Sequence, residues 1–363
     1  MALFNFQTAQ AAPGTWANAN GGSWGTPGKW RGNTIAAGQN DLADFSTLNI
    51  TADRVVTLDT TRTIGQLKFG DATTPSHNWT LNANVGSVLT LKNVGSGTPV
   101  ASITVDNQLT QIDLVVDTQT TETIQKLGLG TLALTGANTI GANSVTQINA
   151  GTLLANNTSG SATGAGSVIV GASGRLGGSG TITSRASIPT AISVSGVLAP
   201  GASVGSIGNL TLNMGSTTGV ATMNPGSSFQ YELGTAGLNF GSVGLSDMLT
   251  INGAGIGDFI LNGNNINFQN TGAVGFYKLF DTDNANTWSG LTFDGTTGDV
   301  TTGLTFTNLT GGLTGKLRFG TDTNGGTKGD IYLQVSSQVI PEPTTALLGG
   351  IGLLVLLRRR RGV

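Results

Sequence analysis

The chain has no cysteine and only one histidine among its 363 residues. Without cysteine there are no disulfides, no thiol nucleophile and no thiolate metal ligands. Charged residues are also scarce, at 10% of the chain, and leave a formal net charge of −2. A chain so close to neutrality offers no electrostatic surface for nucleic acid, so we expect no nucleic-acid partner.

Few side chains are available for acid–base catalysis. A serine triad would have to use His77, which lies in the turn-like segment TTPSHNWT, a context typical of a surface side chain. Glycoside hydrolysis needs two placed carboxylates, but the only glutamates are Glu122, Glu232 and Glu342. The sequence therefore gives little support to either class of hydrolase.

Two aspartates form a further candidate carboxylate pair. Asp41 and Asp44 lie in NDLADF, although aspartate and asparagine in such polar segments are more often turn formers. No dense calcium-binding loop of the GGxGxD kind is present in the sequence. We therefore expect a protein that is not an enzyme and that needs no metal or cofactor.

Glycine, with 57 residues, is abundant and recurs in a pattern. Gly-x-Leu steps begin at Gly130, Gly151, Gly174 and Gly196, which are 21, 23 and 22 residues apart, and Gly65 begins an earlier step. A period near 22 residues is typical of a solenoid in which each repeat forms one turn. Short alternating apolar runs between the glycines predict strands that bury one face.

One repeat, in residues 126–157, is more specific. It combines a glycine-rich strand from Leu127 to Leu132, the turn Gly136-Ala137-Asn138-Thr139 and the step Gly151-Thr152-Leu153. This pattern resembles the autotransporter-associated β-strand repeat, and residues 196–213 are similar to a rung of such passenger domains. The resemblance implies a right-handed parallel β-helix and implies no catalysis.

Differences in composition and repeat pattern divide the chain into five segments. We expect a signal-peptide remnant at 1–12, a strand-rich cap at 13–71, a β-solenoid at 72–218, a looser β-rich continuation at 219–338 and a distinct tail at 339–363. The cap contains Trp16, Trp24 and Trp30 between turn residues. We interpret these tryptophans as a cover over the open end of the strand stack, with stacking against sugars as the alternative.

The tail places three unlike parts in immediate succession. Pro341, Glu342 and Pro343 come first, and the proline rings favour an extended chain. Residues 344–357 follow, and as a helix they would span about 21 Å of a hydrocarbon core of about 30 Å. Their apolar side chains that favour membrane insertion are Leu347, Leu348, Ile351, Leu353, Leu354, Val355, Leu356 and Leu357. The basic stop consists of Arg358, Arg359, Arg360 and Arg361, which the positive-inside rule retains in the cytoplasm.

This order of parts resembles the PEP-CTERM sorting signal of exported bacterial proteins. The resemblance implies recognition by an exosortase-type membrane transpeptidase, cleavage of the tail and delivery to the cell surface or extracellular matrix. The chain would contact the inner membrane of a Gram-negative-type bacterium only transiently, through this tail. A permanent C-terminal anchor, with the prolines serving as a linker, is the alternative.

These observations predict an all-β protein, a right-handed parallel β-helix with a short C-terminal hydrophobic helix. We expect a structural or adhesive role at the cell surface or in the matrix, in association with exopolysaccharide. The alternative is a carbohydrate-active β-helix enzyme that acts on polysaccharide.

Overall fold

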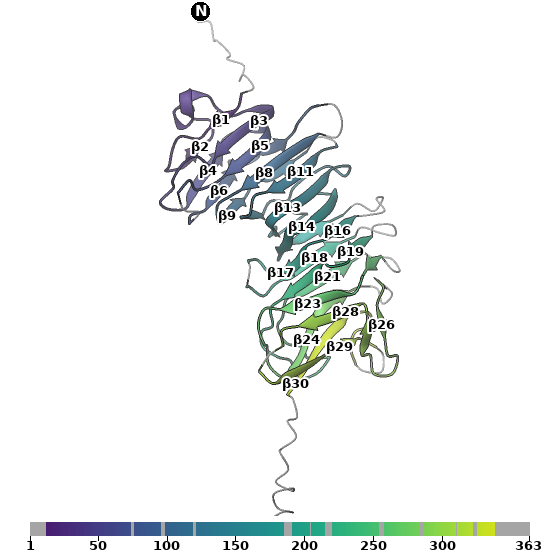
Figure 1. The fold of residues 1–363 in the computed structure, drawn as a ribbon. Helices are drawn as coiled ribbons and strands as arrows, with labels where there is room; N and C mark the ends of the chain where they lie inside the picture. Colours follow the sequence, from purple (N-terminus) through teal and green to yellow (C-terminus); the bar gives the residue numbers. More distant parts are fainter. Residues whose placement is uncertain are drawn as a thin grey trace, which may run out of the picture.

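β-Strands make up nearly all of the regular structure, and most of them pair in parallel. The computed structural model describes residues 12–73, 76–95, 99–118, 121–184, 191–203, 205–214, 220–253, 258–283, 287–309, 311–321 and 325–337. In this part of the chain the helical elements are two short 3-10 turns, η1 (Pro27–Lys29) and η2 (Arg31–Asn33). The strands lie side by side along an elongated body, with the first strands at one end and the last at the other (Figure 1).

The parallel pairings form three series, which we call stacks A, B and C. Stack A joins β1 (Gly14–Thr15), β3 (Gly38–Phe45), β5 (Arg62–Phe69), β8 (Val100–Val105), β11 (Thr123–Leu127), the first halves of β13 (Val145–Ala155) and β14 (Ser167–Gly178), β16 (Ile192–Val194), β19 (Ala221–Met223), β22 (Phe259–Ile260) and β25 (Trp288–Ser289).

Stack B also consists of strands that are parallel to one another. It joins β2 (Gly22–Ser23), β4 (Arg54–Leu58), β6 (Trp79–Ala83), β9 (Leu109–Ile112), β12 (Thr131–Leu134), the second halves of β13 and β14, β17 (Val197–Pro200), β20 (Ser228–Tyr231), β23 (Asn264–Phe268) and β28 (Leu304–Thr307).

Stack C is built in two parts. The first joins the start of β5 to β7 (Val88–Leu91) and β10 (Val115–Asp117), and a bridge extends it to Thr139. The second joins β15 (Thr181–Thr183), β18 (Asn209–Asn213), β21 (Met248–Asn252) and β24 (Gly275–Thr282). From β3 onward the chain visits stacks A, B and C in turn, so the parallel sheet is curled.

The last elements pair differently. β30 (Ile331–Ser337) pairs antiparallel with both β24 and β29 (Leu313–Phe319), and the short strands β26 (Thr292–Phe293) and β27 (Val300–Thr302) pair antiparallel with each other. This antiparallel group lies at the end of the body opposite β1 (Figure 1).

The register of stack B follows the Gly-x-Leu period. Leu132 aligns with Leu153, Leu153 with Leu176, and Leu176 with Leu198, and all four side chains are buried. Beyond Leu198 the alignment continues through Phe229, Ile266 and Phe306. The loss of period in the second half of the sequence therefore comes from longer connections between strands, while the parallel pairing persists.

One part of the predicted alignment is wrong. Leu67 of the Gly65-Gln66-Leu67 step lies in stack A, where it aligns with Ile103, whereas the later steps lie in stack B. The connections near the N-terminus have unequal lengths, so the step at Gly65 is out of phase with the later Gly-x-Leu steps. The predicted C-terminal helix and the whole sorting tail lie outside the described residues, as do residues 1–11.

Candidate functional site

The tryptophans of the N-terminal region are buried. Trp16 and Trp24 are fully buried and Trp30 is 2% exposed. Their indole N–H groups donate to the carbonyl oxygens of Asn18, Ala36 and Trp24 at 2.7, 2.9 and 2.6 Å, respectively. All three rings pack against Phe45 at centroid distances of 5.3–5.5 Å. These rings present no open face to a sugar, so they belong to the core at the β1 end of the body.

His77 has neighbours of the right type for a triad but the wrong geometry. Its Nδ1 atom lies 3.5 Å from Asp71 Oδ2 and 2.9 Å from Ser76 Oγ. A triad requires the carboxylate and the nucleophile on opposite nitrogens of the imidazole ring, because the carboxylate holds the N–H of one nitrogen so that the other can accept the serine proton. Both partners face the same nitrogen here, so this group cannot activate Ser76 as a triad does.

Asp41 and Asp44 have different surroundings. Asp44 Oδ1 accepts hydrogen bonds from Ser46 N at 2.9 Å and Ser46 Oγ at 2.6 Å, so it closes the turn after β3. Asp41 is half-buried, and its Oδ2 atom has no hydrogen-bond partner among the described residues. A carboxylate that holds a turn is unavailable for proton transfer, and this weakens the case for a catalytic pair.

A carboxyl pair that the sequence did not suggest lies between stacks B and C. Asp247 is fully buried, and its two oxygens accept hydrogen bonds from Gly208 N at 2.8 Å and Glu232 N at 2.7 Å. Burial, together with the hydrogen bond from its side chain to that of Glu232, raises the pKa of Asp247 to about 9. Arg175 lies close enough to both carboxyls to interact electrostatically.

The two carboxyl groups lie close together, as catalytic carboxylates do, but a substrate has no access to them. Glu232 is 5% exposed and Asp247 is 0% exposed, so a polysaccharide cannot reach either oxygen. Asp247 instead joins Gly208 to Glu232, at the base of the connection from β20 to β21. Glu122 is likewise 3% exposed and accepts a hydrogen bond from the backbone of Asn93. We interpret these acids as structural.

Lys126 is the other buried ionisable group of note. It is 1% exposed, and its Nζ atom donates to the carbonyl oxygens of Leu127, Gly128 and Ala150 at 2.8, 2.8 and 3.1 Å. Burial lowers the pKa of Lys126 to about 8, partly opposed by the charge of Asp106. The side chain lines an interior void of about 10 Å³.

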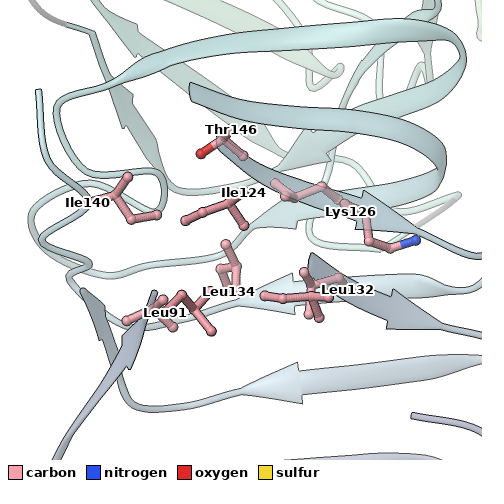
Figure 2. Close-up of a pocket in the computed structure, with 10 residues that line it drawn as sticks. Leu91, Ile124, Lys126, Leu132, Leu134, Ile140 and Thr146 are labelled. Atoms are coloured by element: carbon pink, nitrogen blue, oxygen red, sulfur yellow. The ribbon is translucent and has the colours of Figure 1, made fainter. Parts of the chain in front are cut away.

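The void is a packing defect rather than a ligand site. Its lining is apolar apart from Lys126 and Thr146, and Figure 2 shows the Lys126 amino group directed away from the leucine and isoleucine side chains. A void of this size holds at most about one water molecule, and a water needs several polar partners. No substrate-sized space exists in this part of the described core.

An open groove remains as the candidate site. It lies between β28 and β29, has a volume of about 440 Å³, and is lined by Asp299, Val300, Thr301, Leu304, Thr305, Phe306, Gly315, Lys316 and Leu317. Pockets of about 300–1,000 Å³ that combine apolar surface with a few polar groups are the usual sites for small ligands. Sequence reasoning missed this groove because its walls come from strands at the end of the sheet.

Other features of a functional site are absent from the described residues. This part of the chain contains no group of three or more metal-binding side chains and no helix that is long and apolar enough to cross a membrane. The sorting motif, the apolar segment and the arginines of the tail, from Pro341 to Arg361, lie outside the described residues. Their predicted roles therefore stay predictions.

The protein was compared with protein families, curated proteins and solved structures. No family model matches the chain, and no curated protein and no solved structure matches it either.

Proposed function

We propose that the chain is an exported structural or adhesive protein whose body is a right-handed parallel β-helix. The observation that carries the proposal is the succession of stacks A, B and C from β1 to β28. Each layer satisfies its backbone hydrogen bonds through the next, so the body is a rigid rod with a long lateral surface. Such a surface suits weak, repeated contacts, whose combined strength far exceeds that of each one.

The surroundings of the acidic residues support a non-enzymatic role. Among the described candidate carboxylates, Glu122, Glu232 and Asp247 are buried, Asp44 is engaged in a turn, and Asp41 is half-buried. The rival proposal of a polysaccharide-cleaving enzyme is tested with the double variant Asp41→Asn and Asp44→Asn. Cleavage of polysaccharide by the wild type that disappears in this variant would overturn the structural role.

The second part of the proposal concerns where the protein is delivered, and it rests on the sequence of the tail. We propose that an exosortase-type transpeptidase recognises Pro341, Glu342 and Pro343, while the arginines from Arg358 to Arg361 hold the segment in the inner membrane. The body then reaches the cell surface or the matrix, where exopolysaccharide is the expected partner. The tail would act as a sorting signal that is removed by cleavage.

Mass spectrometry of the mature C-terminus in the native host tests this step. We expect a C-terminus near the Pro-Glu-Pro motif and no peptide from the arginine block. The variant with Pro341→Ala, Glu342→Ala and Pro343→Ala should retain the tail and stay in the membrane fraction. Wild-type protein that keeps Arg358–Arg361 in the mature form would contradict the sorting proposal and favour a permanent anchor.

A further inference from the structure

The groove between β28 and β29 lies where two sheets end. β28 is the last strand of stack B and pairs only with β23 among the described strands. β29 pairs with β30, and the C-terminal end of its outer edge is occupied by a bridge from Asp299 to Arg318 and a hydrogen bond from Phe319 N to Gly298 O at 2.7 Å. Backbone N–H and C=O groups on such edges are available to a ligand. The groove therefore offers hydrogen-bonding backbone as well as side chains.

Phe306 supplies an aromatic wall. Its ring is half-buried and tilts against Phe268 at a centroid distance of 6.1 Å, which fixes its position. Thr301 and Thr305 are exposed and line the same groove. Their hydroxyls already hydrogen-bond to Thr292 Oγ1 at 2.7 Å and Asn265 Oδ1 at 3.2 Å, and each oxygen can still accept a hydrogen bond. An aromatic face packs against the C–H face of a pyranose ring, and flanking hydroxyls hydrogen-bond to the sugar's own hydroxyls.

The charges of the groove favour an anion. Lys316 Nζ lies 2.8 Å from Asp299 Oδ2, and Arg318 Nε lies 3.0 Å from Asp299 Oδ1. Asp299 and Lys316 line the groove itself, and Arg318 lines the adjoining depression, so the local charge of +1 belongs to the two spaces together. The Lys316 side chain is 64% exposed, so an ammonium with three donors keeps part of its capacity for a ligand.

A second depression continues the groove across β29. It has a volume of about 280 Å³ and is lined by Thr314, Gly315, Lys316, Arg318, Gln334 and Ser336, with no carboxylate among them. Gly315 and Lys316 line both spaces, so a chain-like ligand can occupy the two in succession. This depression places cations and neutral hydrogen-bonding groups together, a combination suited to a carboxylate-bearing sugar.

The same residues disfavour an added peptide strand. A lysine in an edge strand and a very short edge strand are devices that prevent pairing with another chain. Lys316 stands in the middle of β29, and β28 has only four residues. A peptide that paired along β29 would cover the ion pair of Lys316 with Asp299 and remove its water. A bound saccharide would leave this ion pair hydrated.

We infer that this groove binds an acidic oligosaccharide, with a sugar ring against Phe306 and a uronate carboxylate at Lys316. The inference rests on the proposed role at an exopolysaccharide matrix and gives that role a specific contact. The ligand class is a uronate-containing polysaccharide, and neutral glucans are expected to bind more weakly because they add no negative charge to the two cations that share Asp299.

Isothermal titration calorimetry with tetragalacturonate tests the inference, with cellotetraose as the neutral comparison. We expect the wild type to bind tetragalacturonate more tightly. Lys316→Gln should weaken this binding by about tenfold through loss of a charge-assisted hydrogen bond, and Phe306→Leu by about threefold through loss of the aromatic face. Lys328→Gln is the matched control, because Lys328 is exposed but does not line either space.

Thermal unfolding followed by circular dichroism confirms that each variant is folded. No binding by the wild type, or binding that neither variant weakens, overturns the groove assignment. Lys316→Gln could instead change the sedimentation of the protein without any effect on sugar binding. That result would identify the β29 edge as a site for strand pairing and would also overturn the groove assignment. Retention of the intact protein in exopolysaccharide separates the two proposals. If the groove binds no sugar but the protein is still retained, the groove assignment fails and the wider structural role stands.

Discussion

Lys126 shows how a single residue couples core stability to pH. Its ammonium group is held by three backbone carbonyls inside stack A, and its pKa is lowered to about 8 because burial disfavours the charged form. The unfolded chain therefore binds more protons than the folded chain between pH 8 and the ordinary lysine value of 10.5. The free energy of unfolding must rise with pH across this window through this group.

We expect Lys126→Met to remove that rise. The variant should also be less stable at pH 7 by about 1–3 kcal/mol, because the carbonyls lose their donor. Urea unfolding of wild type and variant at several pH values from 7 to 10.5 provides the measurement, and the difference between the two curves removes the contribution of all other titrating groups. Lys68→Met, in the same stack, is the control. Parallel curves for the wild type and Lys126→Met would show that Lys126 does not titrate in this range.

The burial of Lys126 had a signal in the sequence, whereas the carboxyl pair had none. Ile124 and Lys126 are two residues apart in a strand, so period-two alternation places both on the inner face. Asp247 meets Glu232 only because the connection between β20 and β21 returns to its starting point. The path of a long connection is not encoded in a strand pattern, so residue chemistry alone did not reveal that contact.

At the scale of strands, the glycine period fixes close contacts between layers. Gly151 has a φ of +68°, and a Cβ atom there would lie 2.5 Å from the carbonyl oxygens of Gly128 and Gly130. Both of those oxygens belong to the preceding layer of the stack. The repeat could be predicted from the sequence because this steric demand recurs once per turn, in step with the buried leucines.

We expect Gly151→Ala to destabilise the fold by about 2–5 kcal/mol, through a strained backbone and steric overlap. Gly86→Ala is the matched control, since Gly86 has a φ of +84° but nothing within 4 Å of an added Cβ. It should cost only the left-handed backbone term of about 1–2 kcal/mol. Chemical unfolding measures both values. Equal losses at the two positions would show that contact between layers is unimportant.

Asn138 joins layers by side-chain hydrogen bonds. Its Oδ1 atom accepts from Val116 N at 2.8 Å and its Nδ2 atom donates to Ala162 O at 2.6 Å. These partners lie 22 and 24 residues away, one turn before and one turn after. The Gly-x-Asn-Thr turn found in the sequence therefore has a physical role, although its pattern alone did not specify which backbone groups the amide would reach.

The whole molecule is organised along one axis, and this limits how far a local change is transmitted. Each layer contacts mainly its neighbours, so stability is approximately a sum of layers and of the interfaces between them. The aromatic cluster of Trp16, Trp24 and Trp30 lies at the β1 end, and a second cluster around Phe280 lies near the other end. The two ends should respond to substitution independently.

Trp24→Ala tests this independence. Trp24 is fully buried, packs 5.3 Å from both Trp30 and Phe45, and donates to Ala36 O at 2.9 Å. Its loss should cost about 3–5 kcal/mol, and hydrogen exchange with mass spectrometry should show faster exchange in β1 to β6 while β20 to β28 keep wild-type protection. Phe280→Ala, which removes a ring packed 5.1 Å from Phe229, should give the opposite pattern. Faster exchange along the entire chain in either variant would mean that the layers unfold as a single cooperative unit.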